Sequence, residues 1–151
     1  MQMHMKNLLG DLWNKKHVLK SPYEALILAS IVEKETHIPH ERTMVASVYL
    51  RRLKIGMPLQ ADPCVAYGLG KKDLQKGDIS KETPYNTYKH KGLPPTPICC
   101  PGRASLEAVF AADENTSHLY FVLGKDGHEF SGDFKAHKKN VKVYRKIQKE
   151  S

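Results

Sequence analysis

The sequence predicts an α+β domain: helices packed on a small antiparallel sheet, with a long ordered loop region forming a groove. Three features support this expectation: two capped apolar segments near the N-terminus, a middle rich in Gly, Pro and Tyr, and two short strand-like segments after residue 117. A chain of 151 residues fits one such domain. We divide it into an N-terminal segment, residues 1–19, with room for a leading helix, and a main domain, residues 20–151.

Two long helices are expected in the first part of the main domain. In SPYEALILASIVEKET, Ser21 suits the N-cap, Pro22 the first helical position, and Glu24 the positive end of the helix dipole. In HERTMVASVYLRRLKIG, basic residues gather near the end and Gly56 provides the stop. Shorter helical signals follow in GRASLEAVFAA and in residues 134–149.

Between these helices, residues 56–103 show little periodicity and read as a long loop region. Loops of this length in a small domain are usually functional or disordered, and the interleaved tyrosines favour order. Farther along, HLYFVL predicts a strand, GKDG a turn, and HEFSG the returning strand of a hairpin. The ordered loop region is therefore expected to form one wall of the groove.

The composition points to an anionic partner. The net charge is +8 and the isoelectric point is near 9.4, which would suit nucleic acid, an anionic membrane surface or an acidic polymer. The longest apolar run falls far short of the roughly 20 residues needed to span a bilayer, and the opening residues do not resemble a secretory signal. The cysteines, Cys64, Cys99 and Cys100, lack CxxC spacing and read as small apolar residues, with a disulfide from Cys64 left open.

Helical geometry separates the two glutamates of EKET. At about 100° per residue, Glu33 and Glu35 point to nearly opposite sides, so they cannot act as a pair. Glu35 falls within about 60° of the stripe formed by Leu28, Ile31 and Val32. Burial against hydrocarbon and the negative end of the helix dipole would both raise the pKa of Glu35, as a general acid requires. The competing interpretation is a surface ion pair of Glu35 with a basic neighbour: Lys34, His37 or Arg42.

Several long motifs together resemble the endolytic murein transglycosylases of the YceG-like family. They are LASIVEKET, RLKIGMPLQADPCVAYGLG, PYNTYKHKGLPPTPICCPG, YFVLGKDGHEF and the closing H-x3-V-x2-Y, which cover roughly residues 20–149 in the family's order. The resemblance implies an enzyme that cleaves the MurNAc–GlcNAc β-1,4 bond inside peptidoglycan strands and leaves 1,6-anhydro-MurNAc ends. It maps the family's catalytic glutamate onto Glu35, in agreement with helical phase, and it implies no metal and no cofactor.

The resemblance also sets expectations for location and partners. It implies a catalytic domain that faces the periplasm, held at the inner membrane by an N-terminal anchor that this sequence lacks, as it lacks the LysM-like subdomain. Peptidoglycan glycan strands would be the substrate, and peptidoglycan synthases are the implied protein partners. Free carboxylates on the stem peptides of the polymer would suit the basic composition.

Five further residues are candidates for substrate binding. The amides of Gln60 and Asn86 suit sugar hydroxyl and N-acetyl groups, and Tyr85 and Tyr88 offer ring faces and hydroxyls. PLQ and PYN resemble, by analogy only, strings in lysozyme-like lytic transglycosylases. The alternative, structural interpretations are that Asn86 caps a turn and that the tyrosines only pack within the fold. Asp62 is expected to cap a helix beginning at Pro63, or else to line the site as a second carboxylate that permits hydrolysis.

Three other functions compete with this interpretation. A nucleic-acid-binding domain would explain the basic charge, but no recognised nucleic-acid motif is present, so nucleic acid is not an expected partner. A metallohydrolase could use His37, His40 and Glu41, although Pro39 interrupts the spacing and a further ligand would be needed. A non-catalytic wall-binding module would keep the groove without needing Glu35.

Overall fold

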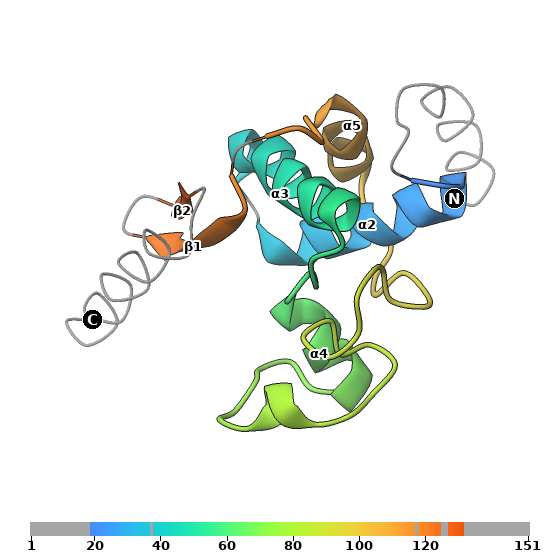
Figure 1. The fold of residues 1–151 in the computed structure, drawn as a ribbon, viewed down its shortest axis with the longest axis vertical. Helices are drawn as coiled ribbons and strands as arrows, with labels where there is room; N and C mark the ends of the chain where they lie inside the picture. Colours follow the sequence, from blue (N-terminus) through green and yellow to red (C-terminus); the bar gives the residue numbers. More distant parts are fainter. Residues whose placement is uncertain (1–18, 37, 117, 125–126, 132–151) are drawn as a thin grey trace.

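The computed structural model describes residues 19–36, 38–116, 118–124 and 127–131. Three helices, α2 (Pro22–Glu35), α3 (Arg42–Ile55) and α5 (Arg103–Ala111), form one part of the molecule. The short helix α4 (Asp62–Leu69) and the irregular chain lie below them, and a β-hairpin projects to one side (Figure 1). The elements are α2 (Pro22–Glu35), η2 (Pro39–Glu41), α3 (Arg42–Ile55), α4 (Asp62–Leu69), η3 (Asp78–Ser80), α5 (Arg103–Ala111), β1 (Tyr120–Gly124) and β2 (Gly127–Ser131).

The two long helices begin and end where the local sequence predicts. The backbone N–H of Glu24 donates to the Ser21 hydroxyl over 3.2 Å, and Pro22 occupies the first turn of α2. A short 3₁₀ turn, η2, leads into α3, which ends at Gly56 with a left-handed φ of 75°. These caps satisfy backbone groups that would otherwise lack partners at the helix ends.

The core lies where α2, α3 and α5 pack on one another. Leu28, Ile31 and Val32 are fully buried as expected, but burial on α2 is not confined to this stripe, since every residue from 27 to 32 is buried. Tyr49 from α3 and Leu106 from α5 are buried against the same cluster. Burying side chains of this size contributes roughly 1.5–3 kcal/mol each, so this helix layer provides a stable base for the last turn of α2.

The prediction that helices pack on a small sheet is not confirmed. In the described residues the sheet is one antiparallel hairpin, β1 with β2, and the helices pack mainly on each other. The hairpin attaches to α3 through an edge-to-face contact of Tyr49 with Phe121, whose ring centroids lie 5.5 Å apart. Short strands without a second hairpin cannot cover a helix layer, so the helices bury one another instead. The expected helix at 134–149 and the segment 1–18 lie outside the described residues.

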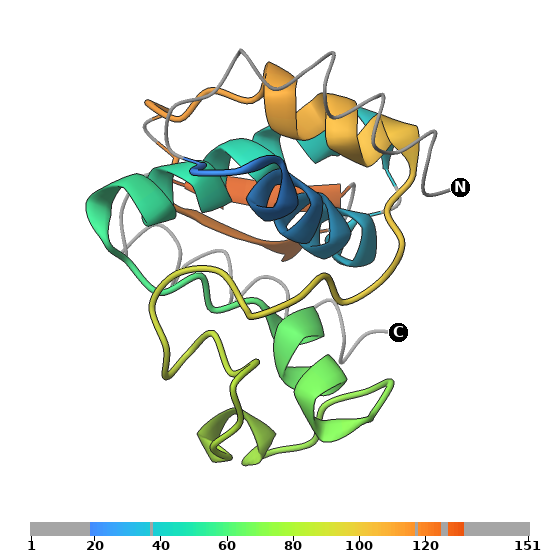
Figure 2. The ribbon, with the colours of Figure 1, turned by 90° about the vertical axis from the view of Figure 1, so that its right-hand side faces the viewer.

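The region predicted as a long loop contains a short helix as well as an ordered irregular chain. After α4 the chain passes through η3 and then runs back beneath α2 towards α5 (Figure 2). Gly68 of α4 lets this returning chain come close, since a Cβ there would lie 2.6 Å from the Thr83 hydroxyl and 2.9 Å from Tyr85 Cβ. The loop region is thus packed against α4.

No helix among the described residues combines the length and the apolar character that crossing a membrane requires.

Candidate active site

Glu33 is used for contacts that hold the helices together. One carboxylate oxygen lies 3.9 Å from a guanidinium nitrogen of Arg42, at the start of α3. The other accepts a 2.7 Å hydrogen bond from the backbone N–H of Gly102, which is the N-cap of α5. Glu33 therefore joins α2 to the beginnings of two other helices, which is a structural task.

Glu35, on the other side of the same turn, faces a cleft. Its Oε2 accepts a hydrogen bond of 3.1 Å from the hydroxyl of Tyr49, a side chain that is only 1% exposed. Glu35 itself is half-buried, and Arg42, a partner considered for it from sequence, pairs with Glu33 instead. A buried tyrosine thus fixes one oxygen of a carboxyl group that borders the cleft.

The cleft has a volume of about 730 Å³. Its walls are the end of α2, one face of α4, residues 71–74 and Ile98, so α4 and the predicted loop region together form the wall opposite α2. Glu35 and Asp62 both line it. A cleft of this size is ample for part of an extended polymer.

The ionisable groups around Glu35 are buried, and its charge contributes to the shifts of their pKa values. Burial, followed by the Glu35 carboxylate, raises the pKa of Tyr49 well above its usual value. The same two causes raise the pKa of the Cys64 thiol to about 12. Burial lowers the pKa of the Arg52 guanidinium, while the charge of Glu35 opposes that shift. Glu35 therefore has buried neighbours on its inner side, with the Arg52 cation within electrostatic reach, while its outer side borders a cleft lined largely by charged residues.

Arg52 connects three parts of the structure. It is 5% exposed, its Nε donates to the Leu119 carbonyl over 2.8 Å, and its Nη1 donates to the Leu59 carbonyl. The guanidinium carbon also lies 5.5 Å from the centre of the Tyr120 ring. Sequence reasoning treated Arg52 only as a basic residue at a helix end. Its spacing of three from Tyr49, which places both on one helix face, is the signal that could have revealed it.

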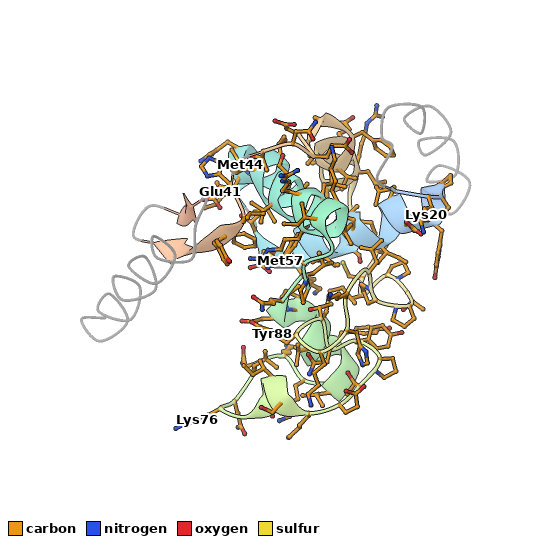
Figure 3. All side chains as sticks on the ribbon, viewed as in Figure 1. Lys20, Glu41, Met44, Met57, Lys76 and Tyr88 are labelled. Atoms are coloured by element: carbon orange, nitrogen blue, oxygen red, sulfur yellow. The ribbon has the colours of Figure 1, made fainter. Side chains whose placement is uncertain are left out.

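Asp62 does not cap α4, so the preferred interpretation of this residue is wrong. The helix begins at Asp62 itself, Ala61 is the N-cap, and no side chain completes the cap. Instead, Asp62 Oδ1 accepts a 2.5 Å hydrogen bond from the hydroxyl of Tyr88. Tyr88 lies between the helix layer and the lower loops (Figure 3), where burial and then Asp62 raise its pKa. The structure thus brings two of the predicted residues together, of which Asp62 lines the cleft.

Asn86 and Tyr85 are engaged within the loop. Asn86 is fully buried; its amide nitrogen donates to the carbonyls of Ile79 and Lys81, and its oxygen accepts from the N–H of Tyr88. This arrangement favours the structural interpretation of Asn86. The Tyr85 hydroxyl shares a hydrogen bond of 2.8 Å with Thr96, and its ring contacts Tyr67, which lines the cleft.

Gln60 is exposed and has an unusual backbone conformation. Its φ of 53° makes it the one non-glycine residue with positive φ in the part of the chain that the structure describes. Such a conformation costs roughly 1–2 kcal/mol, so it needs support from neighbouring contacts. That support includes hydrogen bonds from the N–H of Gln60 to the Thr87 carbonyl and from the N–H of Ala61 to the Thr87 hydroxyl. The side chain of Gln60 is exposed, and Gln60 is not among the residues that line the cleft.

The alternative metal site gains no support from the geometry. Across residues 19–36, 38–116 and the described parts of the hairpin, no group of three or more His, Cys, Asp or Glu side chains could hold a metal ion. Glu41 accepts a hydrogen bond from the Thr36 hydroxyl, His40 is exposed, and His37 lies outside the described residues. All three cysteines are free thiols, with Cys64 in the core.

Known proteins are similar to this chain in sequence and in fold. The curated endolytic murein transglycosylase of Bacillus subtilis (strain 168) is 42% identical over 128 residues, which is 82% of this chain and 35% of that protein. The protein of the same name from Streptococcus pneumoniae (strain D39) is 30% identical over 123 residues, covering 70% of this chain and 22% of its own. The chain therefore spans about a third or less of the length of these relatives.

A solved structure agrees with these matches. A crystal structure of a yceG-like protein from Listeria monocytogenes superposes with a TM-score of 0.72 at 40% identity, over 79% of this chain and 39% of that one. The sequence profile described as the YceG-like family matches residues 1–143. Because this family profile covers most of the chain and a solved relative has the same fold, this chain belongs to the YceG-like family.

Proposed function

We propose that this protein is a lytic transglycosylase that cleaves the MurNAc–GlcNAc β-1,4 bond inside peptidoglycan strands, with Glu35 as its acid and base. The observation that carries the proposal is the position of Glu35: half-buried at the end of α2, held by a buried tyrosine, and open to a cleft. Support comes from the curated relatives, which are named for this activity.

One carboxyl group is sufficient for this reaction because the nucleophile belongs to the substrate. Protonated Glu35 donates its proton to the glycosidic oxygen as the bond from MurNAc C1 breaks, releasing a GlcNAc with a free 4-hydroxyl. The Glu35 carboxylate then removes the proton from the C6 hydroxyl of the same MurNAc, and O6 bonds to C1. The proton count is restored and no water is consumed. An intramolecular nucleophile is favoured by its high effective concentration.

The surroundings of Glu35 suit an acid that starts protonated. Partial burial and the negative end of α2 favour the neutral carboxyl, whereas the Tyr49 hydrogen bond, Arg52 and the lysines that line the cleft favour the carboxylate. Opposing influences of this kind bring a carboxyl group towards a balance in which both forms are accessible. A residue that must act first as acid and then as base needs that balance.

Asp62 and Gln60 would act on the sugar at the broken bond. We assign Asp62, aligned by Tyr88, to the positive charge that develops at C1, and the exposed Gln60 amide to polar groups of the sugar. Tyr88 would contact substrate at the cleft edge. Asn86 and Tyr85 would act by holding the loop, since their polar atoms bond within it.

Product analysis tests the proposal. Purified protein is incubated with uncross-linked glycan strands, and the new ends are identified by mass spectrometry. We expect 1,6-anhydro-MurNAc ends, one water lighter than reducing ends. If Asp62 instead activated a water molecule, reducing MurNAc ends would accumulate and the single-carboxylate mechanism would be refuted.

We also propose where the enzyme works. Its substrate lies outside the inner membrane, so the catalytic domain would act in the periplasmic space on nascent strands, beside the peptidoglycan synthases whose products it shortens. Measuring glycan strand length in cells with and without the Glu35→Gln variant tests this, and unchanged strand length would contradict it.

A further inference from the structure

The cleft continues well past the carboxyl groups. Asp62 lies at the first residue of α4, while residues 71–74, which also line the cleft, follow the other end of the helix. The eight residues of α4 span about 12 Å. The far end of the cleft therefore lies away from the bond that Glu35 would protonate, where it can meet groups that branch from the glycan strand.

The loop at this far end is held in a fixed shape by Asp78. This carboxylate is 2% exposed and accepts hydrogen bonds from the backbone N–H of Gln75 at 2.8 Å and from Lys71 Nζ at 3.1 Å. Lys81 Nζ lies 3.0 Å from its other oxygen. These contacts hold the pKa of Asp78 far below its usual value, so the ion pairs persist at neutral pH. The backbone that carries Lys72 is thus anchored.

Lys72 differs from Lys71 in having no task within the fold. Lys71 is committed to Asp78, whereas no hydrogen bond or ion pair joins Lys72 to any residue that the structure describes. Lys34, which lines the cleft from α2, likewise has no hydrogen bond or ion pair with any described residue. Two ammonium groups therefore border the cleft without a carboxylate partner among the residues that the structure describes.

We propose that Lys72 forms a subsite for the free carboxylates of peptidoglycan stem peptides, with Lys34, next to Glu35 on α2, adding to the positive charge of the cleft. The inference rests on the proposed function, because it assigns a role to the same cleft. The sugar rings are neutral, and the lactyl carboxyl group is used in the amide link to the peptide. The stem peptide is thus the part of the polymer that brings the anions. Asp73, also at this end of the cleft, opposes such binding and limits its strength.

The test compares two strands that differ only in peptide charge. In both, the free amines are acetylated; in one the stem carboxylates remain, and in the other they are converted to carboxamides. Cleavage rates are measured with the wild-type protein, Lys72→Gln and Lys76→Gln. Lys76 is a matched control because it belongs to the same loop but lies at its outer tip, outside the cleft lining (Figure 3).

We expect the wild-type protein to cleave charged strands about threefold to tenfold faster at low salt, the range for one or two screened ion pairs. Lys72→Gln should bring that ratio close to one, while Lys76→Gln keeps it. Asp73→Asn should increase the ratio. Equal cleavage of the two strands by wild-type protein would overturn the subsite, even with anhydro ends forming normally.

Binding provides a readout that does not depend on turnover. In the Glu35→Gln background, the affinities for the two strands are measured with and without Lys72→Gln. A preference for charged strands that Lys72→Gln removes supports the subsite even if no anhydro ends form with active protein, a result that would refute the proposed activity alone. Equal affinities for the two strands overturn the subsite.

Discussion

The two sides of the last turn of α2 present a contrast between a carboxylate used for folding and one placed for chemistry. On one side, Glu33 reaches Arg42 and the N–H of Gly102 and so joins three helices. On the other side, Glu35 is held by a tyrosine and borders a cleft. The two residues are separated by a single position, but the helical turn sends them into different surroundings.

The difference shows what distinguishes a functional acid from a structural one. Glu33 contacts Arg42 and the backbone of Gly102, so its carboxylate serves to hold neighbouring helices together. Glu35 is surrounded by groups whose own pKa values are shifted by burial, and the space in front of it can hold a ligand. Partners, more than burial alone, separate the two roles.

The largest expected effect comes from the chemical side of the turn. Glu35→Gln keeps the shape of the side chain but cannot lose and regain a proton, so the cleavage rate should fall by roughly 10³-fold or more. Thermal unfolding should change little, and strand affinity should remain. Formation of anhydro ends is the measurement, with Glu33→Gln as the matched control. A Glu35→Gln protein retaining a tenth of the activity would contradict the assignment.

The second effect concerns the wall opposite Glu35. Asn86→Ala removes hydrogen bonds to the Ile79 and Lys81 carbonyls and to the Tyr88 N–H, so the free energy of unfolding should fall by about 2–4 kcal/mol. Because Tyr88 aligns Asp62, activity should fall as well. Urea denaturation measures the first quantity. A fully stable but inactive variant would instead indicate direct contact of Asn86 with substrate.

A smaller and more specific change should follow from Tyr49→Phe. The Tyr49 hydroxyl stabilises the Glu35 carboxylate, so its removal favours the protonated form and raises the pKa of Glu35. The acid must be protonated, so the alkaline limb of the pH profile of kcat/KM should move to higher pH. Losing one hydrogen bond costs about 1 kcal/mol of stability. A profile that shifts to lower pH, or not at all, would show that Tyr49 does not tune Glu35.

The smallest effect is expected on the structural side. Glu33→Ala removes the acceptor for the Gly102 N–H and a partly exposed ion pair, so the free energy of unfolding should fall by about 1 kcal/mol. Cleavage by the folded protein should stay within about twofold of the wild type, since less than 1 kcal/mol separates the two rates. Melting curves measure the loss of stability, and cleavage rates measured well below the melting transition show whether activity has changed. A large loss of rate would remove the contrast between the two glutamates.

Local signals predicted much of this arrangement. Ser21 and Pro22 begin α2, Gly56 ends α3, and helical phase alone placed Glu35 on the apolar stripe. The two strands and the turn of the hairpin were also predicted, and β1 and β2 pair antiparallel. Each of these features depends on residues within a few positions of one another, which is the range that patterns in a sequence describe.

The remainder depends on contacts between distant segments. Thr87 bonds to Ala61, 26 positions away, and so sets the path of the chain through Gln60. Asp62 was expected to cap its own helix, but its carboxylate accepts a hydrogen bond from Tyr88, 26 positions away in the sequence. The complete burial of Asn86 likewise follows from packing of the loop on itself. No local pattern encodes such pairings, because each arises only when the loop region folds onto α4.

Arg52 has a consequence for anyone who would redesign this protein. A single flat guanidinium donates to the carbonyls of Leu59 and Leu119, and these two donors diverge in a way that the lone ammonium of lysine cannot reproduce. Grafting a hairpin from another relative, or altering the length of the turn after α3, would displace one of those acceptors. Exchange of either part is therefore expected to succeed only when the other is transplanted with it as one cassette.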